Sequence, residues 1–154
     1  MNNTHHRNLP LACEVARARA GELNSISEYL YLSIVFADAL PELSEYWNRL
    51  AMEEMHHHRA LGELILRLGG DPAERCAVRN SGRINLCEDR DSRAPVAATR
   101  AIKNNITEER HAAENYKRLA TIAERCGDFG AVAFFGKLAA DEMRHAEEQE
   151  AMLS

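Results

Sequence analysis

The segments LAMEEMHH, residues 50–57, and LAADEMRH, residues 138–145, follow one pattern, L-A-x-[DE]-E-M-x-H. Ala, Leu, Glu and Met all favour helix, so both segments are predicted to be helical. Residues three apart on a helix share a face. Glu54 with His57, and Glu142 with His145, would therefore each present a carboxylate and an imidazole in one direction.

The repeat extends beyond these two segments. Glu22 precedes Tyr29 by seven residues, and Glu109 precedes Tyr116 by seven. Glu22 lies 32 residues before Glu54, and Glu109 lies 33 before Glu142. The chain thus reads as two copies of one helical hairpin, and a pseudo-twofold pairing of the copies would bring equivalent residues to one central point.

Proline and glycine divide the 154-residue chain into helices. The breaks fall at Pro41, at Gly69-Gly70-Asp71-Pro72 and at Gly127-Asp128. We expect a flexible N-terminus at 1–9 and one domain at 10–152, with helices at about 10–39, 42–68, 95–126 and 129–152. The link 71–94 is long enough to cross the bundle, which predicts an all-α four-helix bundle with one long crossover. An up-down-up-down bundle with a floppy loop is the alternative.

Composition excludes several classes of protein. A net charge of -5 without a basic stripe argues against nucleic-acid binding. No apolar run approaches the roughly 18–20 residues that span a bilayer, and the N-terminus lacks an apolar signal core. A cytoplasmic location is therefore expected. None of Cys13, Cys76, Cys87 and Cys126 forms a C-x-x-C pair, so no zinc ribbon is visible; whether Cys76 and Cys87 pair stays open.

The polar residues of the repeat suit two metal ions. The predicted ligands are four carboxylates and two imidazoles: Glu22, Glu54, His57, Glu109, Glu142 and His145. Hard oxygens with imidazole nitrogens favour iron or manganese; zinc would bind without redox chemistry. The stripe through Glu109 is apolar, whereas that of its rival Glu108 is more polar, which favours Glu109. A single E-x-x-H is usually a solvated face, but two matched copies, correctly spaced from two further glutamates, argue against that interpretation.

Other polar residues near this set have two interpretations each. Tyr29 and Tyr116 are usually core aromatics at such positions, yet they could hydrogen-bond the carboxylates and so support catalysis. Glu53 and Asp141 could hold the imidazoles in the same way or be simply exposed. His56 and His58 fall on other faces and are expected at the surface.

With these residues in view, the chain resembles the ferritin-like superfamily, specifically bacterioferritins and the erythrin domain of rubrerythrins. Glu22-Leu23 with Tyr29 is similar to the first-helix pattern, and Glu54-Met55-His56-His57 to the second. Residues 141–145, DEMRH, also resemble the D-E-x-R-H form of di-iron monooxygenases. The resemblance covers about residues 10–151 and implies a ferritin-like bundle with two Fe ions.

The chain departs from these families in three places. Few residues follow His145, so the short fifth helix of bacterioferritin is missing, and no rubredoxin domain is visible. Ala112, beside His111, stands where rubrerythrins carry an extra ligand glutamate. Met55 matches the haem-ligating methionine of bacterioferritin, but Met143 occupies the duplicated position, so a packing role is expected and haem is not.

The resemblance implies a ferroxidase-type oxidoreductase in which O2 or H2O2 oxidises Fe(II), for iron handling or oxidative-stress defence. Alternatives are a rubrerythrin-like peroxide reductase fed by a separate redox donor, a di-iron oxygenase, and a metal-free helical interaction module. A homodimer is expected through the first two helices, since a twofold dimer is the commonest soluble assembly. We do not expect a 24-subunit shell.

Overall fold

The structure is a computed structural model that describes residues 8–73 and 94–154. It contains four helices and, within those residues, no strand: α1 (Leu9–Phe36), α2 (Pro41–Arg67), α3 (Ala94–Arg125) and α4 (Phe129–Ala151). Cys76, Cys87 and most of the predicted crossover lie outside the described residues. The prediction of an all-α four-helix bundle is confirmed.

The helix ends follow from local chemistry. Asn8 caps α1 by accepting a hydrogen bond from the backbone N–H of Leu11, and Asp128 caps α4 through the N–H of Ala131. Gly127, with φ of 74°, makes the left-handed turn between α3 and α4. The first helix ends at Phe36 and not at residue 39 as predicted. Pro41 explains this correction, because a residue before proline disfavours helical backbone and the chain must turn before it.

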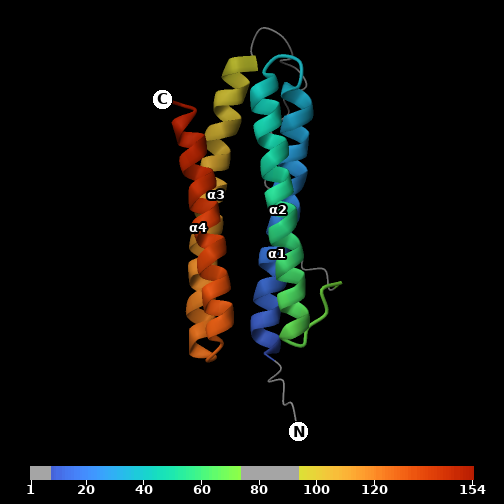
Figure 1. The fold of residues 1–154 in the computed structure, drawn as a ribbon, viewed down its shortest axis with the longest axis vertical. Coiled ribbons are helices and arrows are strands. Elements are labelled where there is room, and N and C mark those ends of the chain that lie inside the picture. The colour runs from blue at the N-terminus through green and yellow to red at the C-terminus, as the bar shows by residue number, and fades with distance from the viewer. Residues whose placement is uncertain (1–7, 74–93) are drawn as a thin grey trace.

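The two hairpins lie side by side (Figure 1). Helices α1 and α2 pack along their length, as do α3 and α4, and the hairpins meet through α1–α3 and α2–α4. Helix α3 begins at the end of the bundle opposite to that where α2 finishes, so α2 and α3 run parallel (Figure 1). This arrangement excludes the up-down-up-down alternative. None of the described helices is both long and apolar enough to cross a bilayer.

The core consists of two apolar clusters separated by a polar layer. One cluster includes Leu11, Leu61 and Phe135, and the other includes Leu32, Trp47 and Ile102. Between them in the sequence of each helix lie the buried carboxylates and imidazoles of the repeat. Burying such groups costs free energy unless they are paired, so this layer is the place to look for function.

Candidate metal centre

The structure brings the six predicted ligands together inside the bundle. Glu22 comes from α1 and Glu109 from α3, while α2 and α4 each supply one Glu-x-x-His pair. The exposed fractions are 5% for Glu22, 1% for Glu54, 8% for His57, 2% for Glu109, 1% for Glu142 and 0% for His145. Glu108 is exposed, so Glu109 is the inward-facing residue of the two.

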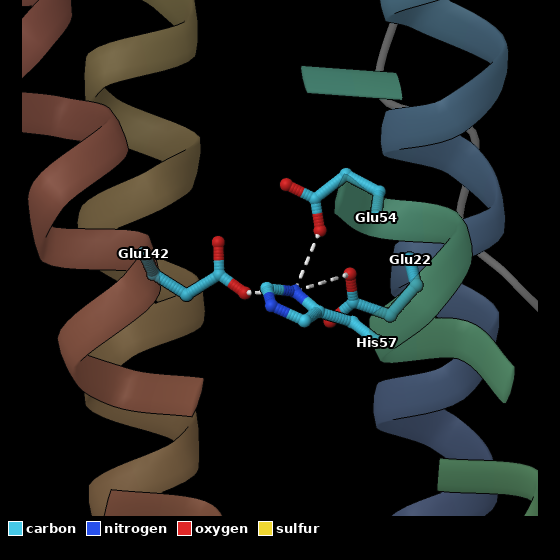
Figure 2. Close-up of side chains that lie close together, drawn as sticks. All are labelled: Glu22, Glu54, His57 and Glu142. Atoms are coloured by element: carbon cyan, nitrogen blue, oxygen red, sulfur yellow. Dashed lines mark hydrogen bonds and ion pairs between the residues drawn. The ribbon is translucent and has the colours of Figure 1, made fainter. Parts of the chain in front are cut away.

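The six residues form two overlapping clusters. Glu22, Glu54, His57 and Glu142 make one, and Glu54, Glu109, Glu142 and His145 make the other. In each cluster, the four candidate ligand atoms all lie within 4.8 Å of one another. Figure 2 shows the first cluster converging from both hairpins. Glu54 and Glu142 belong to both clusters, so each has one carboxylate available to bridge two neighbouring cations.

The distances show how the shared carboxylates divide between the two rings. His57 Nδ1 lies 3.0 Å from Glu54 Oε2, 3.3 Å from Glu142 Oε1 and 3.8 Å from Glu22 Oε2. His145 Nδ1 lies 3.2 Å from Glu54 Oε1, 3.5 Å from Glu142 Oε2 and 3.8 Å from Glu109 Oε2. Each shared carboxylate therefore turns one oxygen toward each histidine, and both rings face the centre with the same nitrogen.

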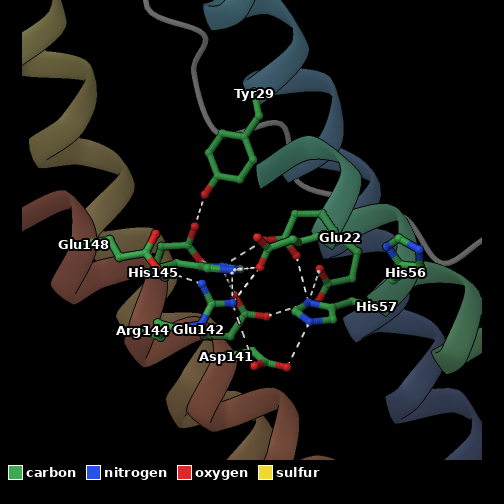
Figure 3. Close-up of polar contacts among 12 residues, drawn as sticks. Glu22, Tyr29, His56, His57, Asp141, Glu142, Arg144, His145 and Glu148 are labelled. Carbon is green, nitrogen blue, oxygen red and sulfur yellow. Dashed lines mark hydrogen bonds and ion pairs between the residues drawn. The ribbon is translucent and has the colours of Figure 1, made fainter. Parts of the chain in front are cut away.

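The outer nitrogens of both rings contact carboxylates from the opposite hairpin. His145 Nε2 lies 3.0 Å from Glu53 Oε2, and His57 Nε2 lies 3.5 Å from Asp141 Oδ2. Both carboxylates are partly exposed but face the imidazoles (Asp141 is labelled in Figure 3). A carboxylate on the outer nitrogen fixes the orientation of an imidazole and leaves the other nitrogen for a metal.

An ion-pair ring surrounds the His145 side. Arg144 contacts Glu53 at 2.6 Å and Glu148 at 2.9 Å, and Arg49 contacts the same two carboxylates at 3.1 Å each. Burial tends to raise the pKa of Glu53, but hydrogen bonds from His145 and Arg144 outweigh it and lower the pKa to about 2. Glu53 thus stays ionised as the partner of His145.

The His57 side has no such ring among the described residues. The repeat places His56 where Arg144 stands, and His56 is exposed, with Nδ1 2.8 Å from the carbonyl oxygen of Met52. Figure 3 shows the His56 ring directed away from the cluster. The two histidines therefore have similar inner contacts and different outer ones.

Each tyrosine of the repeat donates a hydrogen bond to a glutamate of the other hairpin. The Tyr29 hydroxyl donates to Glu109 Oε1, and the Tyr116 hydroxyl donates to Glu22 Oε1. Burial raises the pKa of both phenols well above their ordinary value, and the neighbouring carboxylates add to this effect. Both tyrosines therefore stay protonated and orient Glu109 and Glu22.

Protonation balances the charges of the site when metal is absent. Burial raises the pKa of Glu22, and raises that of Glu109 to about 8, so both keep a proton at neutral pH. For Glu54 and Glu142, burial is outweighed by close contacts with the two histidine rings, which lower the pKa. The same contacts outweigh the burial of the rings, raising the pKa of His57 to about 12 and that of His145 as well. Two imidazolium ions thus face two carboxylates.

Unsatisfied polar atoms show that the donor set suits cations. Glu54 Oε1, Glu142 Oε1 and His145 Nδ1 are buried without a hydrogen-bond partner. Glu54 Oε1 and His145 Nδ1 are only 3.2 Å apart but are not aligned for a hydrogen bond. Leaving such atoms unpaired costs about 1–3 kcal/mol each. Divalent cations in the two clusters would satisfy all three atoms and replace the protons, so the residues fit two metal ions.

A cavity of about 1020 Å³ between α1 and α3 gives access to this layer. Its deep wall includes Glu22, Tyr29, Tyr116 and Glu142. Small and polar residues of the two helices line the rest, among them Ala18, Gly21, Ser25, Asn105, His111 and Ala112. Because Glu22 and Glu142 line this cavity, a solute that enters it meets these carboxylates.

A family model for the ferritin-like domain matches residues 15–154. The chain belongs to the ferritin-like family. Searching curated protein sequences gave no match.

Two solved bacterioferritins resemble this ferritin-like chain. The Desulfovibrio desulfuricans protein, described with its diiron site in different catalytic states, is 21% identical with a TM-score of 0.77, over 99% of this chain and 82% of its own. The Rhodobacter capsulatus protein, described with a metal-free dinuclear site and a heme iron, is 20% identical with a TM-score of 0.74, over 94% and 83%. At these identities the likeness shows the fold.

Sequence reasoning missed the arginine ring and misplaced one histidine. Arg144 and Glu148 are four residues apart on one helix, a spacing that could have indicated their pairing, but Arg49 joins them from a distant part of the chain. His58 was expected at the surface; it is half-buried, and its Nδ1 lies 3.0 Å from the carbonyl oxygen of Arg19.

Proposed function

We propose that this ferritin-like chain is a di-iron carboxylate protein that oxidises Fe(II) with O2 or H2O2. The observation that carries the proposal is the pair of overlapping clusters with Glu54 and Glu142 in common. Such a set can hold two cations close together while its negative charge offsets their repulsion. The diiron site named for the Desulfovibrio desulfuricans bacterioferritin supports iron over manganese.

Each residue has a defined task in this proposal. Glu22 with His57, and Glu109 with His145, would each bind one Fe(II), and the two shared glutamates would bridge the pair. Iron bound there supplies electrons to the oxidant. Tyr29 and Tyr116 orient the outer glutamates, Glu53 and Asp141 orient the histidines, and the cavity between α1 and α3 admits the oxidant.

A second candidate function has one observation in its favour. The cavity beside the site is as large as the roughly 300–1,000 Å³ pockets that bind small molecules, which would suit a di-iron oxygenase with an organic substrate. The rubrerythrin-like peroxide reductase is less well supported, since Ala112 supplies no additional carboxylate. A metal-free interaction module does not account for the unpartnered buried atoms.

Anaerobic loading followed by two oxidants tests the proposal. Metal-free protein is given Fe(II) without oxygen and then mixed with O2 or with H2O2 in parallel. We expect oxidation of bound Fe(II) to be faster than that of free Fe(II), with the faster oxidant identifying the physiological one. A matched Glu54→Gln variant should lose this acceleration, whereas Glu108→Gln, which alters the exposed neighbour of Glu109, should keep it. Equal rates in both variants would contradict the assignment.

Assembly and location remain predictions. We propose a homodimer through α1 and α2, whose outer surfaces carry exposed apolar side chains: Leu23, Leu30, Ile34, Met52, Met55 and Leu66. Apolar area of this kind favours association when it is covered. The cytoplasmic location, the separate redox donor and the expected lack of haem also stay predictions.

A further inference from the structure

Three oxidisable rings lie in contact in one half of the bundle. Tyr29 of α1 stacks on Trp47 of α2, with ring centroids 5.4 Å apart and an interplanar angle of 18°. Trp47 in turn contacts Tyr46 edge-on, with centroids 5.3 Å apart. All three rings are buried, and Trp47 is 0% exposed. They form one continuous aromatic path, called the triad below.

The triad connects the candidate metal centre to the protein surface. At its inner end, the Tyr29 hydroxyl donates a hydrogen bond to Glu109, one of the proposed ligands (Figure 3 shows Tyr29 pointing into the site). At its outer end, the guanidinium of Arg49 lies over the Tyr46 ring, 5.1 Å from its centroid. The Arg49 side chain is 50% exposed. An electron could therefore travel from solvent to the site through rings in contact.

The other half of the repeat has the same packing with rings that are harder to oxidise. Tyr116 stacks on Phe135 at 6.3 Å and 17°, and Phe135 contacts Phe134 at 5.6 Å. Phe135 stands seven residues before Glu142, as Trp47 stands seven before Glu54, and Phe134 matches Tyr46. Phenylalanine thus satisfies the packing requirement at both positions, and packing alone does not account for Trp47 and Tyr46.

The polar atoms of the triad also indicate that Trp47 and Tyr46 are not explained by packing. Trp47 Nε1 and the Tyr46 hydroxyl are both buried without a hydrogen-bond partner. Gln149 lies near Tyr46, but neither end of its amide is aligned for a hydrogen bond. A buried Trp or Tyr usually finds a partner for its polar atom, and an unpaired one destabilises the fold. Phenylalanine would avoid this cost, so the two residues serve something other than stability.

We propose that the triad is an electron relay that delivers single electrons from a one-electron donor at the Arg49 surface to the metal centre. This inference rests on the proposed function. Two Fe(II) ions held by the six ligands would supply two of the four electrons needed to reduce O2 to water. Full reduction to two molecules of water takes two more electrons and four protons from solvent. The relay supplies these two electrons, one at a time, from the external donor.

Each transfer leaves the three rings unchanged. Tyr29 would give one electron to the metal centre and pass its hydroxyl proton to Glu109. Trp47 then gives one electron to the Tyr29 radical, which recovers its proton from Glu109. The external donor reduces the oxidised Trp47 through the Tyr46 ring, and is itself oxidised by one electron. Tyr46 acts as a bridge, because its hydroxyl has no partner to take a proton.

A metal-free experiment tests the path by itself. Trp47 is the single tryptophan of the chain, so laser photo-oxidation gives a tryptophan radical at one known position. At pH 9, where Glu109 is ionised and can take the Tyr29 proton, we expect this radical to be replaced by a tyrosyl radical at a rate independent of protein concentration. A Tyr29→Phe/Tyr46→Phe double variant should lose the tyrosyl signal, and Tyr116→Phe, the matched change in the other half, should keep it. An unchanged signal in the double variant overturns the relay.

The second experiment uses the iron-loaded protein with ferrocyanide as the one-electron donor. After O2 is added, ferricyanide formation and H2O2 release are measured together with bound iron. Trp47→Phe should lower ferricyanide formation by more than an order of magnitude and increase H2O2 release, with bound iron unchanged. Phe135→Trp should behave like the parent protein. Equal ferricyanide formation in the parent and Trp47→Phe proteins overturns the proposal.

The two experiments separate failure of the relay from failure of the proposed function. If no variant oxidises Fe(II), the proposed function fails and the photo-oxidation result alone decides whether the triad conducts electrons. If Fe(II) is oxidised in every variant and the ferricyanide yields are equal, the metal site stands and the relay is wrong. Melting curves of each variant verify that it is folded.

Discussion

The two hairpins supply equivalent inner residues and different outer ones. Around the centre, Glu22, Glu54 and His57 of the first hairpin have direct counterparts in the second, and each histidine meets a carboxylate of the opposite copy. Outside this layer, and within the part of the chain that the structure describes, the arginine ring lies beside His145 and the oxidisable aromatic path leads to Glu109, without a counterpart in the other half. The duplicated pattern therefore accounts for binding two cations, and the divergent surroundings make the two cation positions chemically unequal.

The largest effect is expected from the carboxylates that both halves use. Glu54→Ala or Glu142→Ala removes an oxygen from each cluster, so we expect both ions to be lost. His57→Ala affects one cluster and should leave an ion beside His145. Metal analysis after loading and dialysis distinguishes these results. If Glu54→Ala lost only one ion, the bridging role would be wrong and the two clusters would be independent.

The next effect concerns the outer surfaces of the hairpins. The exposed apolar side chains of the first hairpin lie along α1 and α2, whereas those of the second lie at or just beyond helix ends: Val96, Phe129, Met152 and Leu153. We expect Ile34→Glu to convert a dimer of about 35 kDa, twice the 17.3 kDa chain, into a monomer. Val96→Glu is the matched control, since Val96 is 72% exposed and Ile34 75%. Light scattering gives the mass, and a dimer that persists in Ile34→Glu would exclude this surface.

A smaller effect is expected on the stability of the metal-free protein as the pH changes, and it differs between Glu109 and the shared Glu54. Native Glu109 holds its proton up to a pKa of about 8, against 4.5 ordinarily. Because the folded state binds more protons over this window, the metal-free protein should lose stability as pH rises from 4.5 to 8. The shared Glu54 has a lowered pKa, so its contribution is lost only on acidification below its ordinary value.

Metal should reverse the first of these trends, since it binds the deprotonated ligands. Thermal melts should show that stabilisation by Mn(II) grows between pH 4.5 and 8, reaching about 2.7 kcal/mol at 100 times the dissociation constant. Glu109→Gln should reduce the pH dependence of the metal-free protein in that window. A metal-free melting temperature that rises steadily over the same range would contradict the burial argument.

The smallest effect concerns the outer partners of the histidines. Removing a carboxylate that holds a metal-binding histidine typically lowers metal affinity about 10–100-fold. We expect Glu53→Ala to weaken the His145 position by more than Asp141→Ala weakens the His57 position, because the contacts are 3.0 Å and 3.5 Å. His56→Ala, which alters a ring turned away from the site, should change neither affinity. Competition with a metal-binding dye measures the metal affinity of all three variants. Equal losses of affinity in Glu53→Ala and Asp141→Ala would contradict the predicted difference between the two metal positions.

The sequence predicted the parts of the molecule that depend on local spacing. The presence of four helices and the inward face of Glu109 follow from periodicity along each helix. The breaks follow from the backbone preferences of proline and glycine. Which tyrosine meets which glutamate does not, because Tyr29 contacts Glu109 only through the pairing of α1 with α3. The ring of Arg49, Glu53, Arg144 and Glu148 likewise requires α2 to face α4. The end of α1 was missed because the turn before Pro41 takes the residues that helix propensity assigned to the helix.

Anaerobic titration of the metal-free protein with Fe(II) tests the central claim most directly. Bound iron is counted per chain for the parent protein and for a Glu54→Ala/Glu142→Ala variant whose folding is verified by its melting curve. The overlapping clusters predict two tightly bound Fe(II) ions per chain in the parent and none in the variant. A parent protein that binds no iron, or a variant that binds as much as the parent, would contradict a metal centre shared between the two hairpins.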